Sequence, residues 1–178
     1  MKSDKLGVCV IGAGRAGLIH AVNFAKGIKN ARLTTIAEPN RETAEQACKE
    51  LEVERHYQEY RQALEDDAVD AVVVVTPTAY HKDIVVAAAN AGKHILCEKP
   101  MAMTVAECDA MIAAVEKNDV VLQSGFMRRF DRSFVYAKEQ IKQGAIGDVV
   151  LVKSLTRGPS IPQRWQYDIA KSNGPLAE

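Results

Sequence analysis

Three glycines and one acid near the amino terminus have the types and spacing that bind a phosphate-bearing ligand. Gly12, Gly14 and Gly17 follow an apolar run and open a helix-like pattern, and Glu38 comes about 20 residues after the last of them. Such a turn brings backbone amides and the positive end of a helix to a pyrophosphate, while the acid accepts hydrogen bonds from ribose hydroxyls. The combination predicts a dinucleotide-binding loop; the alternative is a glycine turn without a ligand.

The residues near this acid also bear on which dinucleotide binds. The Glu38 carboxylate would repel a 2′-phosphate, which favours NAD over NADP. Arg41 follows shortly after it and could pair with such a phosphate. Arg15 either folds over the pyrophosphate or covers the start of the helix. NAD is the predicted cofactor, with NADP as the less favoured alternative.

Two later apolar runs end in residues that could do chemistry. Thr76 and Pro77 follow a run of valines, and Glu98 and Lys99 follow residues 95–97. Ligands of a doubly wound sheet bind where its parallel strands end, so both pairs are expected at the cofactor. Lys99 is then either a proton-transfer group beside the nicotinamide or a surface lysine paired with Glu98. Its position alone leaves both open.

The turn after the valine run also has an ordinary interpretation, in which Thr78 caps the next helix. His81 is predicted to be a solvated residue of the first turn of that helix rather than an acid or base. The predicted cofactor-binding residues are Gly12, Ala13, Gly14, Arg15, Ala16, Gly17, Glu38, Arg41, Thr76, Pro77, His81, Glu98 and Lys99.

The elements that must position these residues are short β-branched runs alternating with helix-length segments. Strands are predicted at 6–11, 33–37, 71–75, 94–97 and 120–122, with a weak one near 56–57. Helices are predicted at 80–91, ended by Gly92, and at 104–118, begun by a capping box of Thr104 and Glu107. Repeated β-α-β units predict an α/β fold with a doubly wound parallel sheet, a Rossmann fold.

The pattern changes after residue 122. A helix is predicted at about 131–143 and a longer strand at 147–157, and residues 158–178 show no period. We expect a dinucleotide-binding domain over 1–124. Residues 125–178 would begin a second α/β domain that is incomplete, because one helix and one strand do not close a core.

Composition narrows the class of protein. The 178 residues carry 23 basic and 23 acidic side chains, so there is no net charge to attract nucleic acid or an anionic membrane. Apolar runs are too short for a membrane span or a signal peptide. Cys9, Cys48, Cys97 and Cys108 lack metal-type spacing, so no metal site is predicted. Two of them, Cys9 and Cys97, are expected to be buried thiols of a cytoplasmic protein.

Several spaced motifs carry a family resemblance. GAGRAGLIH, TPTAYH, AGKHILCEKPMAMT and GFMRRFD together resemble the glucose–fructose oxidoreductase / inositol dehydrogenase (Gfo/Idh/MocA) family, and most of all its inositol 2-dehydrogenase branch. The resemblance implies an NAD-dependent enzyme that transfers hydride between the cofactor and a secondary alcohol of a cyclic polyol or sugar. It implies Lys99 as a catalytic residue beside nicotinamide and substrate, and Met127 and Arg128 beside the polyol. Arg128 and Arg129 could instead bridge the domains through salt links.

The end of the sequence resembles the approach to another motif of that family, an acid followed by a histidine. SNGPLAE places Glu178 where the catalytic acid belongs, and no histidine follows. The resemblance therefore implies a truncated form that lacks the catalytic histidine, with an isolated chain that is expected to be inactive, and a dimer or tetramer for the complete protein. The alternatives are an NAD-dependent glycoside hydrolase of the same family and a dinucleotide-binding module without turnover.

Overall fold

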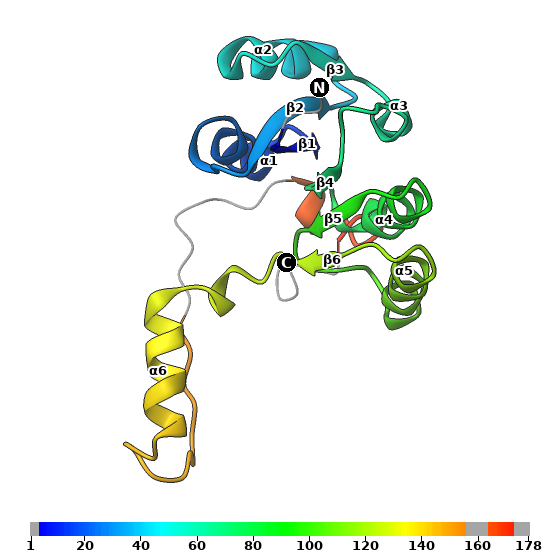
Figure 1. Cartoon of the computed structure of the whole chain (residues 1–178). Coiled ribbons are helices and arrows are strands. Elements are labelled where there is room, and N and C mark those ends of the chain that lie inside the picture. Colours follow the sequence, from blue (N-terminus) through cyan, green and yellow to red (C-terminus); the bar gives the residue numbers. More distant parts are fainter. Residues whose placement is uncertain (1–3, 156–163, 173–178) are drawn as a thin grey trace.

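The computed structural model describes residues 4–155 and 164–172. Its centre is a six-stranded sheet in which each neighbouring pair of strands is parallel (Figure 1). The chain moves outward in one direction from β1 and then in the other from β4, which confirms the predicted doubly wound Rossmann fold. In spatial order the strands are β3 (Arg55–Tyr57), β2 (Ala31–Ala37), β1 (Leu6–Ile11), β4 (Ala71–Val74), β5 (His94–Cys97) and β6 (Leu122–Ser124).

Helices cover both faces of the sheet. One face carries α1 (Arg15–Val22), continued by the π-helical turn η1 (Asn23–Gly27), and α2 (Arg41–Leu51). The other carries α3 (Tyr60–Leu64), α4 (His81–Asn90) and α5 (Val105–Lys117), on the right in Figure 1. Because helices cover both faces, the central strand β4 is apolar on both sides. Val73 packs into the core beside α1 and α2, and Val72 and Val74 pack into the core beside α3, α4 and α5.

The thiols behave as the sequence predicts. All four cysteines are free, and Cys9 and Cys97 are completely buried in the core beside α3, α4 and α5. Burial raises the pKa of the Cys97 thiol to about 12. At neutral pH this thiol is therefore protonated and unreactive, and it acts as a small apolar core residue.

The predicted helix at 104–118 is confirmed together with its cap. The Thr104 hydroxyl accepts the Glu107 N–H at 3.2 Å, and the Glu107 carboxylate accepts the Thr104 N–H at 3.2 Å. At the other end, Asp119 has a φ of 50° and Val120 donates its N–H back to Val115. Because this turn still belongs to the helix end, β6 begins at Leu122 instead of the predicted residue 120.

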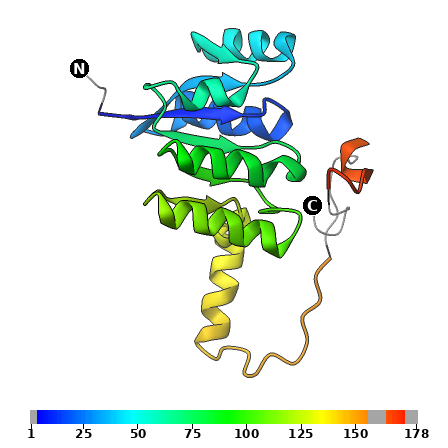
Figure 2. The same cartoon turned by 90° about the vertical axis from the view of Figure 1, so that its right-hand side faces the viewer.

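The predicted strand at 147–157 is wrong over its described part. The helix before it, α6 (Arg132–Lys142), begins at Asp131, whose side chain accepts the Ser133 N–H, and extends away from the sheet (Figure 2). Residues 148–155 then form no strand, and Val150 is 95% exposed. An apolar run becomes a strand only beside a hydrogen-bonding neighbour, and no described strand lies next to this one. Residues 156 and 157 lie outside the described part. A domain boundary at 124, where β6 ends, stays a prediction.

One buried carboxylate ties β3 to the turn before β4. Asp66, whose side chain is 7% exposed, accepts hydrogen bonds from Arg55 at 2.9 Å, from the Ala68 N–H at 2.8 Å and from the Tyr57 hydroxyl at 3.4 Å. Burial alone would raise the pKa of this carboxyl, but the hydrogen bonds outweigh it and hold the pKa below its ordinary value. The ionised form therefore stabilises the folded state.

Because the pKa of Asp66 is lowered in the folded state, we expect the stability of the protein to depend on pH. A depressed folded-state pKa contributes stability that is present above the unfolded pKa of about 3.9 and is lost as pH falls through the folded value. Asp66→Asn should lower the free energy of unfolding by about 2 kcal/mol at pH 7, and less as pH falls below about 4. Urea titrations at both pH values measure this. Asp67→Asn, at the exposed neighbouring residue, is the control, and an equal loss in both variants would contradict the assignment.

No helix of the described residues is long and apolar enough to cross a membrane.

Candidate functional site

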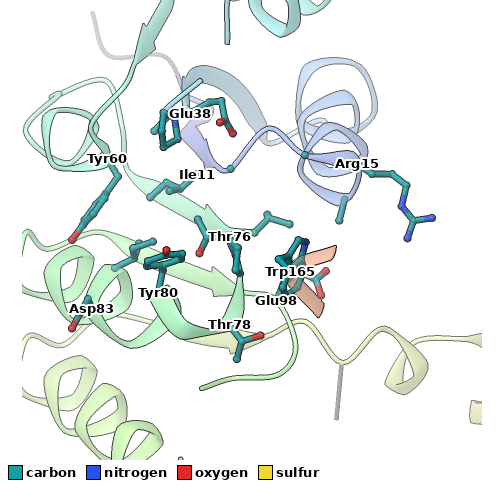
Figure 3. Close-up of a pocket in the computed structure, with 18 of the residues that line it drawn as sticks. Ile11, Arg15, Glu38, Tyr60, Thr76, Thr78, Tyr80, Asp83, Glu98 and Trp165 are labelled. Carbon is teal, nitrogen blue, oxygen red and sulfur yellow. The ribbon is translucent and has the colours of Figure 1, made fainter. Parts of the chain in front are cut away.

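A cleft of about 710 Å³ lies at the carboxyl ends of the strands, where the topology switches between β1 and β4 (Figure 3). Loops after β1, β2, β3, β4 and β5 line it, together with a segment near residue 165. This is the place where open α/β sheets bind ligands. Nine of the predicted cofactor-binding residues line the cleft: Gly12, Gly14, Arg15, Ala16, Glu38, Thr76, Pro77, Glu98 and Lys99.

The three glycines of the loop meet different surroundings. Gly12 has a φ of 98°, and a Cβ there would lie 2.8 Å from the Val75 carbonyl oxygen. A Cβ on Gly17 would lie 1.8 Å from the Gly12 carbonyl oxygen. A Cβ on Gly14 would meet nothing within 4 Å, since this residue faces the open cleft. Two glycines thus permit the tight turn and the close packing of α1 on β1, and the third leaves room for a ligand beside backbone amides.

The acid at the end of β2 closes over the glycine loop. The Glu38 carboxylate accepts the Ala13 N–H at 2.8 Å through one oxygen and the Asn40 N–H at 3.0 Å through the other. These bonds fix the carboxylate at the edge of the cleft (Figure 3). Arg41, three residues after Glu38, lies outside the cleft. It donates a hydrogen bond at 2.7 Å to Glu45, one helical turn away. Its guanidinium is therefore engaged on the outer surface of α2.

The loop after β4 presents a buried hydroxyl without a partner. Thr76 lines the cleft, and its Oγ1 has no hydrogen-bond partner among the described residues. Such an atom is costly to bury, so it is suited to a bond with a bound ligand. Thr78 does not cap α4: it is buried and begins the 3₁₀ turn η2 (Thr78–Tyr80), and Tyr80 occupies the cap position of α4.

The prediction of a solvated His81 is wrong. The side chain is 1% exposed, and its ring nitrogens lie 2.8 Å from the carbonyl oxygens of Thr76 and Pro100. The residue belongs to the inner face of α4 together with Ile84 and Val85. His81 therefore ties the loop after β4 to the loop after β5 and does not line the cleft itself.

The lysine of the EKP motif reaches the cleft at the end of β5. Lys99 is half-buried and lines the cleft, and its N–H donates to the Glu98 carboxylate at 3.1 Å. The peptide bond between Lys99 and Pro100 is cis. The other Glu98 oxygen accepts a hydrogen bond from His20 of α1 at 2.8 Å. The hydrogen bond from His20, followed by the Lys99 N–H, holds the pKa of the Glu98 carboxyl below its ordinary value despite burial.

The remaining predicted residues lie elsewhere. Ala13, in the loop after β1, and Gly17, in the first turn of α1, do not line the cleft. Met127, in the turn η3 (Met127–Arg129), is 64% exposed, and Arg128 bonds Asp131 at 3.1 Å within its own segment. This salt link joins residues three positions apart in one segment. Glu178 lies outside the described residues.

Several cleft residues were not predicted. Residues 58–61, Tyr80 and Asp83 also line it, as do Trp165 and Gln166 of the turn η4 (Arg164–Tyr167). Figure 3 shows Trp165 at the cleft. The backbone fixes this last segment, because Ala79 donates its N–H to the Lys171 carbonyl at 3.3 Å. Residues 58–61 follow the weak strand near 56–57, which was a usable signal. Nothing in the local pattern indicated the tryptophan.

Comparison with known proteins places this site in a family. Residues 6–126 match the Gfo/Idh/MocA family, described as "Oxidoreductase family, NAD-binding Rossmann fold". The scyllo-inositol 2-dehydrogenase (NAD(+)) of Bacillus subtilis is 39% identical over 153 residues, which are 86% of this chain and 45% of that protein. The myo-inositol 2-dehydrogenase of Thermotoga maritima is 40% identical over 153 residues, covering 86% and 46%. The chain thus spans about half the length of these relatives.

A solved structure is similar over the same region. The scyllo-inositol dehydrogenase of Lactobacillus casei, with bound NAD(H) and scyllo-inositol, aligns with a TM-score of 0.77 and 34% identity, over 81% of this chain and 43% of that one. Fold, cleft and family match together define an NAD-binding Rossmann domain of an oxidoreductase family. The chain belongs to the Gfo/Idh/MocA family, as its motifs indicated.

The residues present fit the dinucleotide of this family. The space at Gly14 lies next to the amino end of α1, which suits a pyrophosphate. The fixed Glu38 carboxylate suits ribose hydroxyls, and the Thr76 hydroxyl, which has no partner among the described residues, suits a hydrogen bond to the ligand. The cleft volume also lies in the range of cofactor sites.

Proposed function

We propose that this protein is an NAD-dependent oxidoreductase acting on a secondary alcohol of a cyclic polyol of the inositol type. The observation that carries the proposal is that Glu38 and Lys99 line one cleft from opposite sides of the switch point. A dinucleotide whose adenosine ribose lies at Glu38 extends across the glycine loop toward Lys99. Relatives at about 40% identity are named for inositol oxidation.

The proposed role of Lys99 is proton exchange with the substrate hydroxyl. NAD supplies the hydride acceptor. The amine of Lys99, at the nicotinamide end of the cleft, takes part in moving the hydroxyl proton. Backbone amides at Gly12 and Gly14 bind the pyrophosphate, and Thr76 and Pro77 contact the nicotinamide half. Met127 and Arg128 are proposed to approach the polyol, and Glu178 to join them as the acid of the site.

The preference for NAD over NADP is supported by two contacts. A 2′-phosphate would lie against the Glu38 carboxylate, which its own bonds to Ala13 and Asn40 hold in place. Arg41, the cation that could offset this repulsion, is bonded to Glu45 on the outside of α2. Both contacts act in the same direction, so we propose that NADP binds more weakly.

The test first measures NAD binding and then the oxidation of an added polyol. NAD at about 100 times its dissociation constant should stabilise the chain by about 2.7 kcal/mol, seen as a raised melting temperature. Adding myo- or scyllo-inositol to a full-length protein that contains this chain should then produce NADH absorbance. NAD binding without NADH formation by that protein would contradict the oxidoreductase proposal and favour a dinucleotide-binding module. Release of a sugar from a glycoside without net NADH would favour the hydrolase alternative. Homo-oligomerisation and a cytoplasmic location stay predictions.

A further inference from the structure

We infer that His20 and Glu98 are positioning residues for Lys99: the histidine on the cofactor-binding helix fixes the carboxylate that holds the backbone of the lysine. The inference rests on the proposed role of Lys99. It assigns His20 a role in the site, and it assigns Glu98 the role of holding the Lys99 backbone in place of direct contact with the cofactor.

The first contact joins two elements that are distant in sequence. The His20 Nε2 and the Glu98 Oε1 lie 2.8 Å apart, and each side chain is 22% exposed. An ionised carboxylate only accepts hydrogen bonds, so the ring nitrogen is the donor. Such a charge-assisted bond, largely shielded from water, is stronger than an exposed one. It connects α1, whose amino end faces the cleft, to the end of β5.

The second contact passes this constraint to the lysine. The Glu98 Oε2 accepts the Lys99 N–H at 3.1 Å, so the carboxylate bridges the histidine ring and the lysine backbone. The following residue is fixed as well, because the Pro100 carbonyl lies 2.8 Å from the Nδ1 of His81. A histidine therefore contacts each sequence neighbour of Lys99: His20 of α1 contacts the Glu98 side chain, and His81 of α4 contacts the Pro100 carbonyl. A catalytic amine needs such support to keep a productive position.

A third contact leaves the carboxylate little space to move. A Cβ added to Gly125 would lie 3.0 Å from the Cδ and the Oε2 of Glu98. The Gly125 N–H donates to the Cys97 carbonyl at 2.7 Å, so this glycine is fixed against the end of β5. The side chain of Glu98 is thus enclosed by the ring of His20 and the backbone of residues 99 and 125.

The experiment measures hydrogen exchange of individual amides by NMR on the isotope-labelled chain with NAD bound. His20→Ala should accelerate exchange of the Lys99 amide about tenfold, the effect of losing one charge-assisted hydrogen bond. His20→Gln keeps a donor and should restore protection to within about threefold of the parent. Gly125→Ala displaces the carboxylate without touching the histidine and should accelerate the Lys99 amide as well. Ile19→Ala, at the exposed neighbouring position in α1, is the matched control and should have no effect.

The Val73 amide in β4 distinguishes positioning from general stability. Equal acceleration of Lys99 and Val73 in His20→Ala would show a purely structural role and overturn the inference. An unchanged Lys99 amide in His20→Ala would also overturn it. These outcomes differ from failure of the proposed function, in which the parent chain binds no NAD or Lys99→Met retains full turnover.

Discussion

In a full-length protein that contains this chain, the Lys99→Met variant is expected to form NADH from a cyclic polyol about 10²–10⁴ times more slowly than the parent, the usual loss for an acid–base group. Methionine has nearly the same length and keeps the packing of the side chain, but it carries no exchangeable proton. Because Lys99 is proposed to act at the nicotinamide end and not to hold the ribose or the pyrophosphate, the dissociation constant of NAD should change by less than about threefold. Initial rates and calorimetric titration with NAD measure the two quantities.

The control for this substitution is Lys49→Met, at an exposed position on α2 far from the cleft lining. It removes the same charge and should leave both rate and affinity unchanged. Equal turnover in Lys99→Met and the parent would remove this residue from the mechanism. A large loss of NAD affinity would instead assign the lysine to cofactor binding.

The Glu38→Ala variant is expected to bind NAD about 10 to 100 times more weakly, because two hydrogen bonds from ribose hydroxyls to a carboxylate are lost. The same change removes the negative charge that repels a 2′-phosphate, so NADP binding should improve relative to NAD. The ratio of the two dissociation constants, measured by calorimetry, is the decisive quantity. An unchanged ratio would show that Glu38 is not the ribose acid.

A second substitution separates charge from loop structure. Since Glu38 also accepts the Ala13 N–H, its removal loosens the glycine loop. Glu38→Gln keeps an acceptor for this bond and loses only the charge. It should therefore weaken NAD binding less than Glu38→Ala does, while still raising the affinity for NADP relative to that for NAD. Glu42→Ala, an exposed acid in the first turn of α2, is the control and should leave both affinities unchanged.

Much of the fold could be predicted because its signals are local. Strand β4 is apolar on both faces, and the capping box at Thr104 lies within four consecutive residues, so neither depends on distant contacts. The predicted strand at 147–157 failed for the opposite reason. Whether that apolar run pairs depends on a neighbouring strand that no local pattern reveals.

The candidate site could be predicted in part. The glycine loop and Glu38 follow from spacing alone, because the turn and the helix end fix where a pyrophosphate can lie. His81 was misjudged although a signal existed: with Ile84, Val85 and Ala88 it shares the helical spacing of the buried face of α4. The bond between His20 and Glu98 had no such signal, since 78 positions separate the partners.

The position of Trp165 gives this protein a built-in optical reporter. The sequence contains one tryptophan, and it lines the cleft beside the loop after β4. All indole fluorescence therefore arises at a single point, next to the proposed nicotinamide half. Reduced nicotinamide absorbs in the region where indole emits, so cofactor occupancy can be read as quenching without any attached dye.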